Sequence, residues 1–310
     1  MENETNVTEE TLEPQNKASK KQYFTAGAII AIAVVVAGGL AWLYMGSLSS
    51  AKEKIFKAVP LPAALVDMQP VSAKSVIERI DLAKQLSTAQ GSTTPVNNSD
   101  IFEQLLDVKK IETLANHRKL SVSQTDIDEE YQKIIKQYAN GDEEGFKTEL
   151  EKTYRMSPEE FKDEVIKQEL LQSQLLIWYN QQKDLNKATY DTTAQLQKKL
   201  DDGQSFDDVA KQFTQDESTK DFAGDSGVIA FNDLLPEFRT ALQDAKVGDI
   251  KMVVSRYGNH ILKVLELNND GQDGQKQIHL QQIFVKQVGF TDWLTSQSNN
   301  IRVIKLLKFN

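Results

Sequence analysis

Residues 224–267, GDSGVIAFNDLLPEFRTALQDAKVGDIKMVVSRYGNHILKVLEL, decide the fold of this chain. The stretch begins with a glycine turn, continues through a helix around LLPEFRTAL, and ends in a strand that carries His260. Turn residues, helix and strand follow one another within a short length, which predicts a small unit of mixed helix and sheet.

The residues before this stretch extend the pattern. A helix from about Asp191 closes at Gly203, which suits the left-handed C-terminal position, and Ser205 caps the next helix, SFDDVAKQF. In order, GQSFDDVAKQFTQDESTKDFAGDSGVIAF, LLPEFRTAL, VGDI and SRYGNHILKV resemble the parvulin family of peptidyl-prolyl isomerases. The resemblance implies a domain over residues 185–290, with a four-stranded antiparallel sheet flanked by helices.

The chemistry that this resemblance implies is rotation about the prolyl amide, against a barrier of about 18–20 kcal/mol. An enzyme lowers the barrier by binding the twisted amide better than the planar one, with an apolar cup for the ring and polar groups nearby. Family members commonly build the cup from a Leu, a Met and a Phe. The match assigns Leu234 and Phe238 to the last two positions and Ser226 to the position that is usually Leu.

The polar residues of the family site are a Cys or Asp before the glycine turn and two histidines on neighbouring strands. Asp216 in TQDES matches the first, and His260 matches the second histidine, with Tyr257 near the same rim. Structural roles stay open for both residues. His260 could hold neighbouring strands together, and Asp216 could cap a turn or a helix.

The strand that opens a parvulin domain with an H-I-L run has no counterpart in residues 185–192, and an empty position would leave backbone groups unpaired. Residues 277–286, QIHLQQIFVK, alternate as a strand does and end in QIFVK where the family reads HILVK. We expect this late strand to fill the early position, a circular rearrangement that puts Gln282 in place of the first histidine. Glutamine can hydrogen-bond but cannot titrate, and His279 should point to the opposite face.

Residues 58–184 predict a mainly helical lobe with amphipathic helices over 101–115 and 123–138 and a long helix from Ser157 to about Asp184. The order of a strand, helices, KLSVSQTDIDEEYQKI and MSPEEFKDEVIKQELLQSQL resembles the N-terminal chaperone region of SurA-like and PrsA-like foldases. We expect residues 291–310 to complete this lobe, with a closing strand over 301–307 that pairs near residues 64–68. For each residue of these apolar stripes taken singly, the core of a helical bundle is the simpler interpretation and the one that we adopt.

Residues 23–45 contain no charge, and a helix of this length can span a hydrocarbon layer of about 30 Å. A cleaved signal peptide is the alternative, although its apolar region would be unusually long. Residues 1–22 are polar and acidic, which predicts a disordered cytoplasmic tail. We expect the bulk of the chain on the extracytoplasmic side, although the lysines that flank the span are balanced in number.

Composition excludes other classes of function. The chain of 310 residues has a net charge of -9 and no clustered basic face, so it should repel a nucleic-acid backbone. Cysteine is absent, and the three histidines lack a paired ligand spacing, so we expect no metal and no cofactor.

The predicted fold class is therefore α+β, with a transmembrane helix, a SurA-like helical chaperone lobe and a parvulin-like domain. The predicted function is a membrane-anchored extracytoplasmic prolyl isomerase and chaperone. Its partners would be unfolded or proline-containing exported polypeptides, with one helix in the lipid bilayer. The alternatives are a catalytically inactive chaperone of the same shape and a single-pass scaffold or sensor, against which the short, featureless N-terminal tail argues. The sequence leaves the oligomeric state open.

Overall fold

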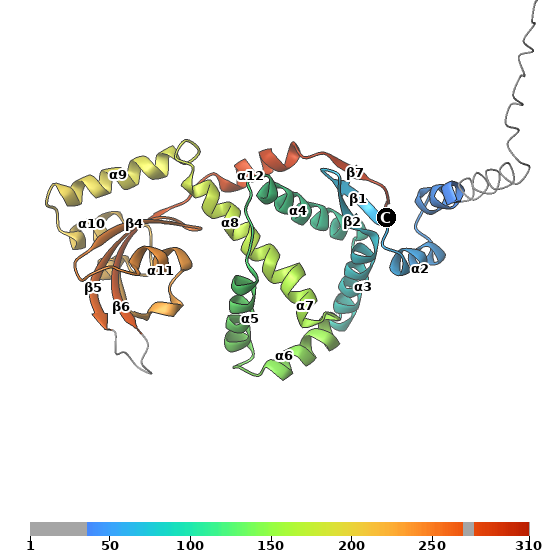
Figure 1. Cartoon of the computed structure of the whole chain (residues 1–310), viewed down its shortest axis with the longest axis horizontal. Helices are drawn as coiled ribbons and strands as arrows, with labels where there is room; N and C mark the ends of the chain where they lie inside the picture. Colours follow the sequence, from blue (N-terminus) through green and yellow to red (C-terminus); the bar gives the residue numbers. More distant parts are fainter. Residues whose placement is uncertain (1–35, 269–275, 310) are drawn as a thin grey trace, which may run out of the picture.

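The computed structural model describes residues 36–268 and 276–309. These residues form two units along the long axis of the molecule, which we call the helical lobe and the sheet unit (Figure 1). The lobe comprises α2(Ser50–Ala58), β1(Pro62–Val66), β2(Gln69–Ser72), α3(Ala73–Ala89), α4(Asn98–His117), α5(Gln124–Tyr138), α6(Glu143–Glu149), η1(Leu150–Tyr154), α7(Pro158–Phe161), η2(Lys162–Ile166), α8(Lys167–Gln181), α12(Phe290–Asn299) and β7(Val303–Lys305). The sheet unit comprises α9(Lys187–Asp201), α10(Phe206–Phe213), η3(Lys220–Phe222), β3(Asp225–Ala230), η4(Phe231–Asp233), α11(Pro236–Leu242), β4(Ile250–Ser255), β5(Gly258–Asn268) and β6(Gln277–Lys286).

Helices of the lobe begin where capping residues stand. Ser123 and Ser157 each form a capping box, in which the hydroxyl accepts a hydrogen bond from a backbone N–H and an acidic side chain accepts one from the backbone N–H of the serine. Pro158 follows at the first helical position, where its missing N–H costs nothing. α7, η2 and α8 then run on without a break to Gln181, close to the predicted end of the long helix.

The small sheet of the lobe contains strands that come before the sheet unit in the sequence and one that comes after it. β1 lies between β2 and β7, and Ala64 pairs with Lys305 while Val66 pairs with Val303. The predicted return of the closing strand to residues 64–68 is therefore confirmed. Beyond β7, the buried ring of Phe309 packs against the lobe core.

The sheet unit contains a four-stranded antiparallel sheet in the order β3-β6-β5-β4. β6 is an interior strand, since Ile278 pairs with Ile229 of β3 on one side and with Leu267 of β5 on the other. This position satisfies backbone groups of both neighbours. The prediction that the late segment 277–286 fills an interior position is confirmed.

Two glycines allow other backbone segments to approach β6 closely. Gly224 has φ +79°, and a Cβ atom there would lie 2.0 Å from the carbonyl oxygen of Gln282. Gly258 has φ +146°, and its Cβ would lie 2.2 Å from the carbonyl oxygen of Val285. Only glycine meets both the backbone angle and the space at these positions.

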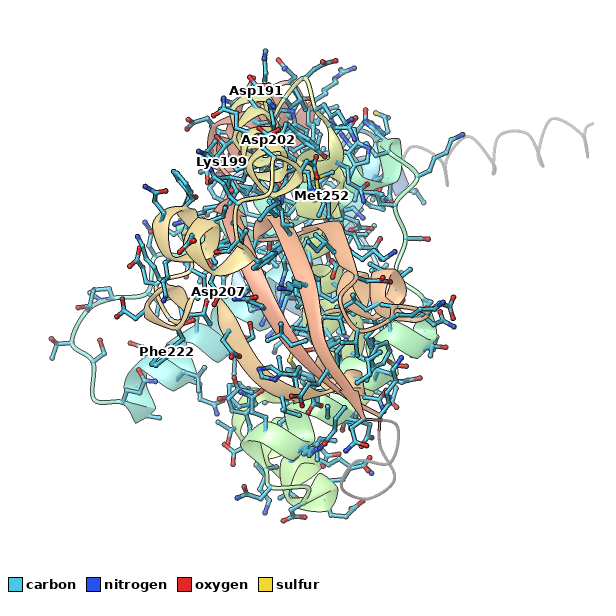
Figure 2. The ribbon with its side chains drawn as sticks, turned by 90° about the vertical axis from the view of Figure 1, so that its left-hand side faces the viewer. Asp191, Lys199, Asp202, Asp207, Phe222 and Met252 are labelled. Carbon is cyan, nitrogen blue, oxygen red and sulfur yellow. The ribbon has the colours of Figure 1, made fainter. Side chains whose placement is uncertain are left out.

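Helices cover both faces of the sheet. α11 packs on one face, where Leu242 and Leu262 are buried, and α9 and α10 pack on the other, where Leu196 and Ile261 are buried. Leu262 and Ile261 are adjacent on β5, so their opposite directions follow from the strand period of two. Figure 2 looks onto this unit, with Asp191 and Lys199 marking α9, Asp207 marking α10 and Met252 marking β4.

Among the helices of residues 36–268 and 276–309, none is both long and apolar enough to cross a lipid bilayer. Residues 36–44 of the expected span are helical. Residues 23–35 of that span and the expected tail over 1–22 lie outside the described residues.

Candidate active site

A cleft of about 380 Å³ opens beside α11, on the face of the sheet that this helix covers. Its floor is formed by side chains of β5 and β6, and its rim by the loop after α10 and the turn between β4 and β5. The lining residues are Gln215, Asp216, Glu217, Leu235, Phe238, Tyr257, His260, Gln282 and Phe284.

A chain of hydrogen bonds crosses the floor of the cleft. The Nδ1 atom of His260 lies 3.2 Å from Oε1 of Gln282, and Nε2 of Gln282 donates to Oδ2 of Asp216 over 2.8 Å. An ionised carboxylate can only accept, so the amide nitrogen of Gln282 must face Asp216 and its oxygen must face His260. The imidazole therefore carries its proton on Nδ1.

The other imidazole nitrogen of His260 is also bound. Nε2 lies 2.8 Å from Oγ of Ser255, and because Nδ1 carries the proton, the serine hydroxyl donates and Nε2 accepts. Ser255 is fully buried, and its Oγ accepts from the backbone N–H of Tyr257. The tautomer and the ring orientation of His260 are thus fixed from both sides.

His260 is 5% exposed, and burial lowers the pKa of its imidazole from 6.5 to about 4. The hydrogen bond to Gln282 and the charge of Asp216 act in the opposite direction but are smaller than the effect of burial. The imidazole is consequently neutral at physiological pH. It can orient an amide through a dipole, but it supplies no positive charge.

Asp216 provides the negative end of the chain. Burial by itself would raise the pKa of this carboxyl, but hydrogen bonds from Ser218, Thr219 and Gln282 together outweigh it, so the pKa lies below its usual value. Asp216 also caps the turn that follows it, because Oδ1 accepts from the backbone N–H of Ser218 and Oδ2 from the hydroxyl of Thr219. The same carboxylate therefore holds the loop and faces the cleft.

Aromatic rings enclose the imidazole. The ring of Phe238 meets His260 edge-on with centroids 4.8 Å apart, and the ring of Phe284 stacks on the imidazole, also at 4.8 Å. Leu235 and the half-exposed Tyr257 complete the apolar wall. The arrangement offers an apolar surface next to a fixed row of hydrogen-bonding groups, which suits a five-membered ring joined to an amide.

Five of the seven residues that the sequence singles out lie together in this cleft: Asp216, Tyr257, Phe238, His260 and Gln282. Leu234 does not. It is buried in the core under α11, because Leu234 and Leu235 are both extended and so point in opposite directions, with Leu235 toward the cleft. Ser226 lies on β3, which pairs with residues 277–281 of β6, away from the cleft over Gln282.

Sequence reasoning missed Phe284 and Ser255. Phe284 follows Gln282 by two residues on β6, so the strand period places both on one face, and that signal was available. Ser255 lies at the end of β4, and its contact with His260 depends on the tight turn between β4 and β5. His279 pairs instead with Asp225 on β3, so it points away from the site as expected.

Within the part of the chain that the structure describes, no group of three His, Cys, Asp or Glu side chains could hold a metal ion. The hydrogen-bonded row of the site consists of an amide, a neutral imidazole, a carboxylate and a hydroxyl. These groups can stabilise a twisted amide by hydrogen bonding alone.

Comparison with known proteins agrees with this geometry. Residues 154–268 match the PPIC-type PPIASE domain family, so this part of the chain is similar to a peptidyl-prolyl isomerase domain. The foldase protein PrsA 2 of Bacillus anthracis is 31% identical over 204 residues, which cover 58% of this chain and 68% of the relative. The chain belongs to the PrsA family of foldases.

Two further relatives extend the comparison. PrsA 2 of Bacillus cereus is 32% identical over 163 residues, 48% of this chain and 55% of the relative. The chaperone SurA of Nitrosospira multiformis is 32% identical over 105 residues, 32% of this chain and 24% of the relative. A crystal structure of the peptidylprolyl isomerase PrsA from Bacillus anthracis matches 64% of this chain and 86% of that chain, with 24% identity and a TM-score of 0.21.

Proposed function

We propose that the cleft around His260 is the isomerase site of a membrane-anchored foldase, which acts outside the cytoplasm on exported proteins. The observation that carries the site is the fixed row of hydrogen bonds from Ser255 through His260 and Gln282 to Asp216, next to the apolar wall of Phe238. In a relative with two histidines an imidazole would take the place of Gln282. Here the neutral amide keeps the hydrogen-bond chain intact.

Each group has one role in this proposal. Phe238, Leu235 and Phe284 receive the proline ring, while Tyr257 borders the preceding residue. Gln282 links the carboxylate of Asp216 to His260, and its second amide N–H can donate to the twisted amide, since both nitrogens of His260 are engaged within the protein. No bond is made to the enzyme, because rotation needs only better binding of the twisted form, with each 1.4 kcal/mol giving about a tenfold rate.

The proposed domains follow the fold. Residues 58–184, completed by 291–310, would form the chaperone lobe that holds unfolded segments, and residues 185–290 would form the isomerase domain. The charge-free sequence from 23 to 45 supports a single membrane anchor, with residues 1–22 in the cytoplasm. The foldase names of the relatives support exported polypeptides as clients.

An isomerase assay on a short X-Pro peptide tests the site. His260→Ala and Asp216→Ala should each reduce kcat/KM by more than tenfold, whereas His279→Ala and Asp244→Ala, outside the cleft, should not. Rates equal to that of the unmodified chain for both cleft variants would overturn the assignment. Wild-type protein with no rate above the uncatalysed one, but with full suppression of aggregation of an unfolded client, would establish the inactive chaperone instead.

The anchor is tested separately by membrane fractionation of the full chain and of a chain that begins at residue 46. Full-length protein should sediment with membranes and resist extraction at high salt, and the shortened protein should not. Protease added to intact cells from which the wall has been removed should digest the residues after 46. Protection of those residues would show that the orientation is the opposite of the one proposed.

A further inference from the structure

A second cavity, of about 450 Å³, lies between the helical lobe and the sheet unit. We call it the interlobe groove. Its walls come from α5 and α8 on one side and from residues 233–240, with Arg256, on the other. Val122, Leu170 and Ile177 give the lobe side an apolar floor.

The interlobe groove is a neighbour of the isomerase cleft. Leu235 lines both cavities. On α11, Phe238 faces the cleft and the adjacent Glu237 faces the groove, and after β4 Tyr257 lines the cleft while Arg256 lines the groove. An extended polypeptide that passes Leu235 with its proline in the cleft would place the residues on one side of that proline in the groove.

The charges in the groove are unequal, because six carboxylates and three cations line it. Each of the three cations already has a partner within the protein. The contacts are Arg239 with Glu129 at 3.9 Å, Lys133 with Glu130 at 3.3 Å, and Arg256 over the ring of Tyr257 at 5.0 Å. The three cations of the groove are thus already in contact with groups of the chain itself.

Four of the carboxylates are left without a cation, and one of these, Asp126, accepts the hydrogen bonds of the capping box at Ser123. Glu169, Asp233 and Glu237 make no ion pair with any other described residue, and Oε2 of Glu237 is buried without a hydrogen-bond donor. An acceptor removed from water without a donor costs free energy, which an ammonium or guanidinium group from a ligand would recover. The apolar floor beside these carboxylates suits the methylene stem of lysine or arginine.

We propose that the interlobe groove is an extension of the substrate site that selects extended polypeptides with lysine or arginine close to the proline. The proposal rests on the proposed function of the cleft, because the bound proline fixes which residues reach the groove. The shared wall at Leu235, the apolar floor and the unpaired carboxylates favour a basic segment over an acidic or a neutral one. The preference should weaken as salt rises, since the carboxylates at the groove rim are exposed to solvent.

The test uses the full chain and peptides with a single proline, flanked on the amino or the carboxyl side by two lysines, two glutamates or two serines. On one side of the proline, the lysine peptide should exceed the glutamate peptide by about tenfold in kcat/KM and in affinity measured by fluorescence anisotropy. Equal values for lysine and glutamate on both sides would overturn the proposal.

Charge-reversal variants assign the preference to the groove. Glu169→Lys combined with Asp233→Lys, both exposed, should abolish or invert the preference, while Asp244→Lys, an exposed carboxylate of the sheet unit outside the groove, should preserve it. If the double variant and the Asp244→Lys variant lost the preference equally, the preference would depend on net charge alone and the assignment to the groove would be wrong. The rate on serine-flanked peptides tests the isomerase site without any charge in the peptide. If those peptides are not isomerised, fluorescence anisotropy still measures whether the lysine peptide binds more tightly than the glutamate peptide. The two proposals can therefore fail independently.

Discussion

Oε1 of Gln282 on β6 lies 3.2 Å from Nδ1 of His260 on β5. The contact exists because β6 enters the sheet next to β5. It makes a neutral amide the link between a buried imidazole and an ionised carboxylate. Four predictions test the consequences of this arrangement.

The first prediction concerns the amide itself. Gln282→Leu should lower kcat/KM on an X-Pro peptide by at least about tenfold, because Nδ1 of His260 then has no acceptor and Asp216 loses one donor. Gln282→His should retain activity, since a neutral imidazole can accept from one neighbour and donate to the other. A leucine variant as active as the wild type, with an unchanged melting temperature, would contradict the role of the amide.

The second prediction concerns pH. The pKa of His260 is about 4 in the folded chain and about 6.5 when unfolded, so the unfolded chain binds more protons between these values. Stability should therefore fall as the pH drops from about 6.5 to about 4, by an amount on the order of 3 kcal/mol for the full shift. Urea unfolding across this range measures it, with His260→Gln as the reference that lacks the titration. Parallel curves for the two proteins would contradict the neutral buried imidazole.

Activity should stay constant over the pH range in which neither His260 nor Asp216 changes its charge. The imidazole is neutral and Asp216 is ionised from neutral pH down to about pH 5, so kcat/KM on a peptide without ionisable groups should be flat over that range.

The third prediction concerns the close approach at Gly224. Gly224→Ala should destabilise the sheet unit and lower kcat/KM, because the new methyl group would meet the carbonyl oxygen of Gln282. Gly227→Ala is the matched control, since Gly227 also has a positive φ but has nothing within 4 Å of its Cβ position. Both variants carry the backbone cost of about 1 kcal/mol, and the difference between their free energies of unfolding isolates the clash. Equal losses would place the effect in the backbone alone.

The fourth prediction concerns the link between the two units. Nδ2 of Asn180 on α8 donates to the carbonyl oxygen of Ser255 over 2.7 Å, and both residues are buried. Asn180→Leu should therefore cost about 1–3 kcal/mol of stability and lower kcat/KM, because the turn that positions the hydroxyl of Ser255 loses its anchor. Gln181→Leu, at the exposed neighbouring position, should change neither. Unfolding and peptide assays on the two variants decide the matter.

Much of the fold could be predicted from the sequence because the signals were local. A few neighbouring residues are enough to indicate a helix start at the capping boxes of Ser123 and Ser157 and a strand in the alternation of residues 277–286. The interior position of β6 followed from a physical requirement, since a sheet with an empty central position leaves backbone groups unpaired. The five recovered site residues came from the match to the parvulin motif, and only His260 and Gln282 among them lie on strands.

The misplaced residues were those whose direction depends on irregular backbone. Leu234 and Leu235 are adjacent and chemically identical, so only the extended conformation before α11 decides which of them faces the cleft. Ser226 follows Asp225 at a bulge in β3, where the regular alternation of directions is interrupted. The unpaired carboxylates of the interlobe groove come from separate segments, and no local pattern brings them together.

The pairing of β7 with β1 sets an order of assembly on the ribosome. β1 emerges early, whereas its partner emerges only after every strand of the isomerase sheet has been synthesised. A nascent chain can thus complete the sheet unit while the small sheet of the helical lobe is still open at one edge. The sheet of the helical lobe is thus completed later than the sheet unit, when residues 303–305 pair with β1.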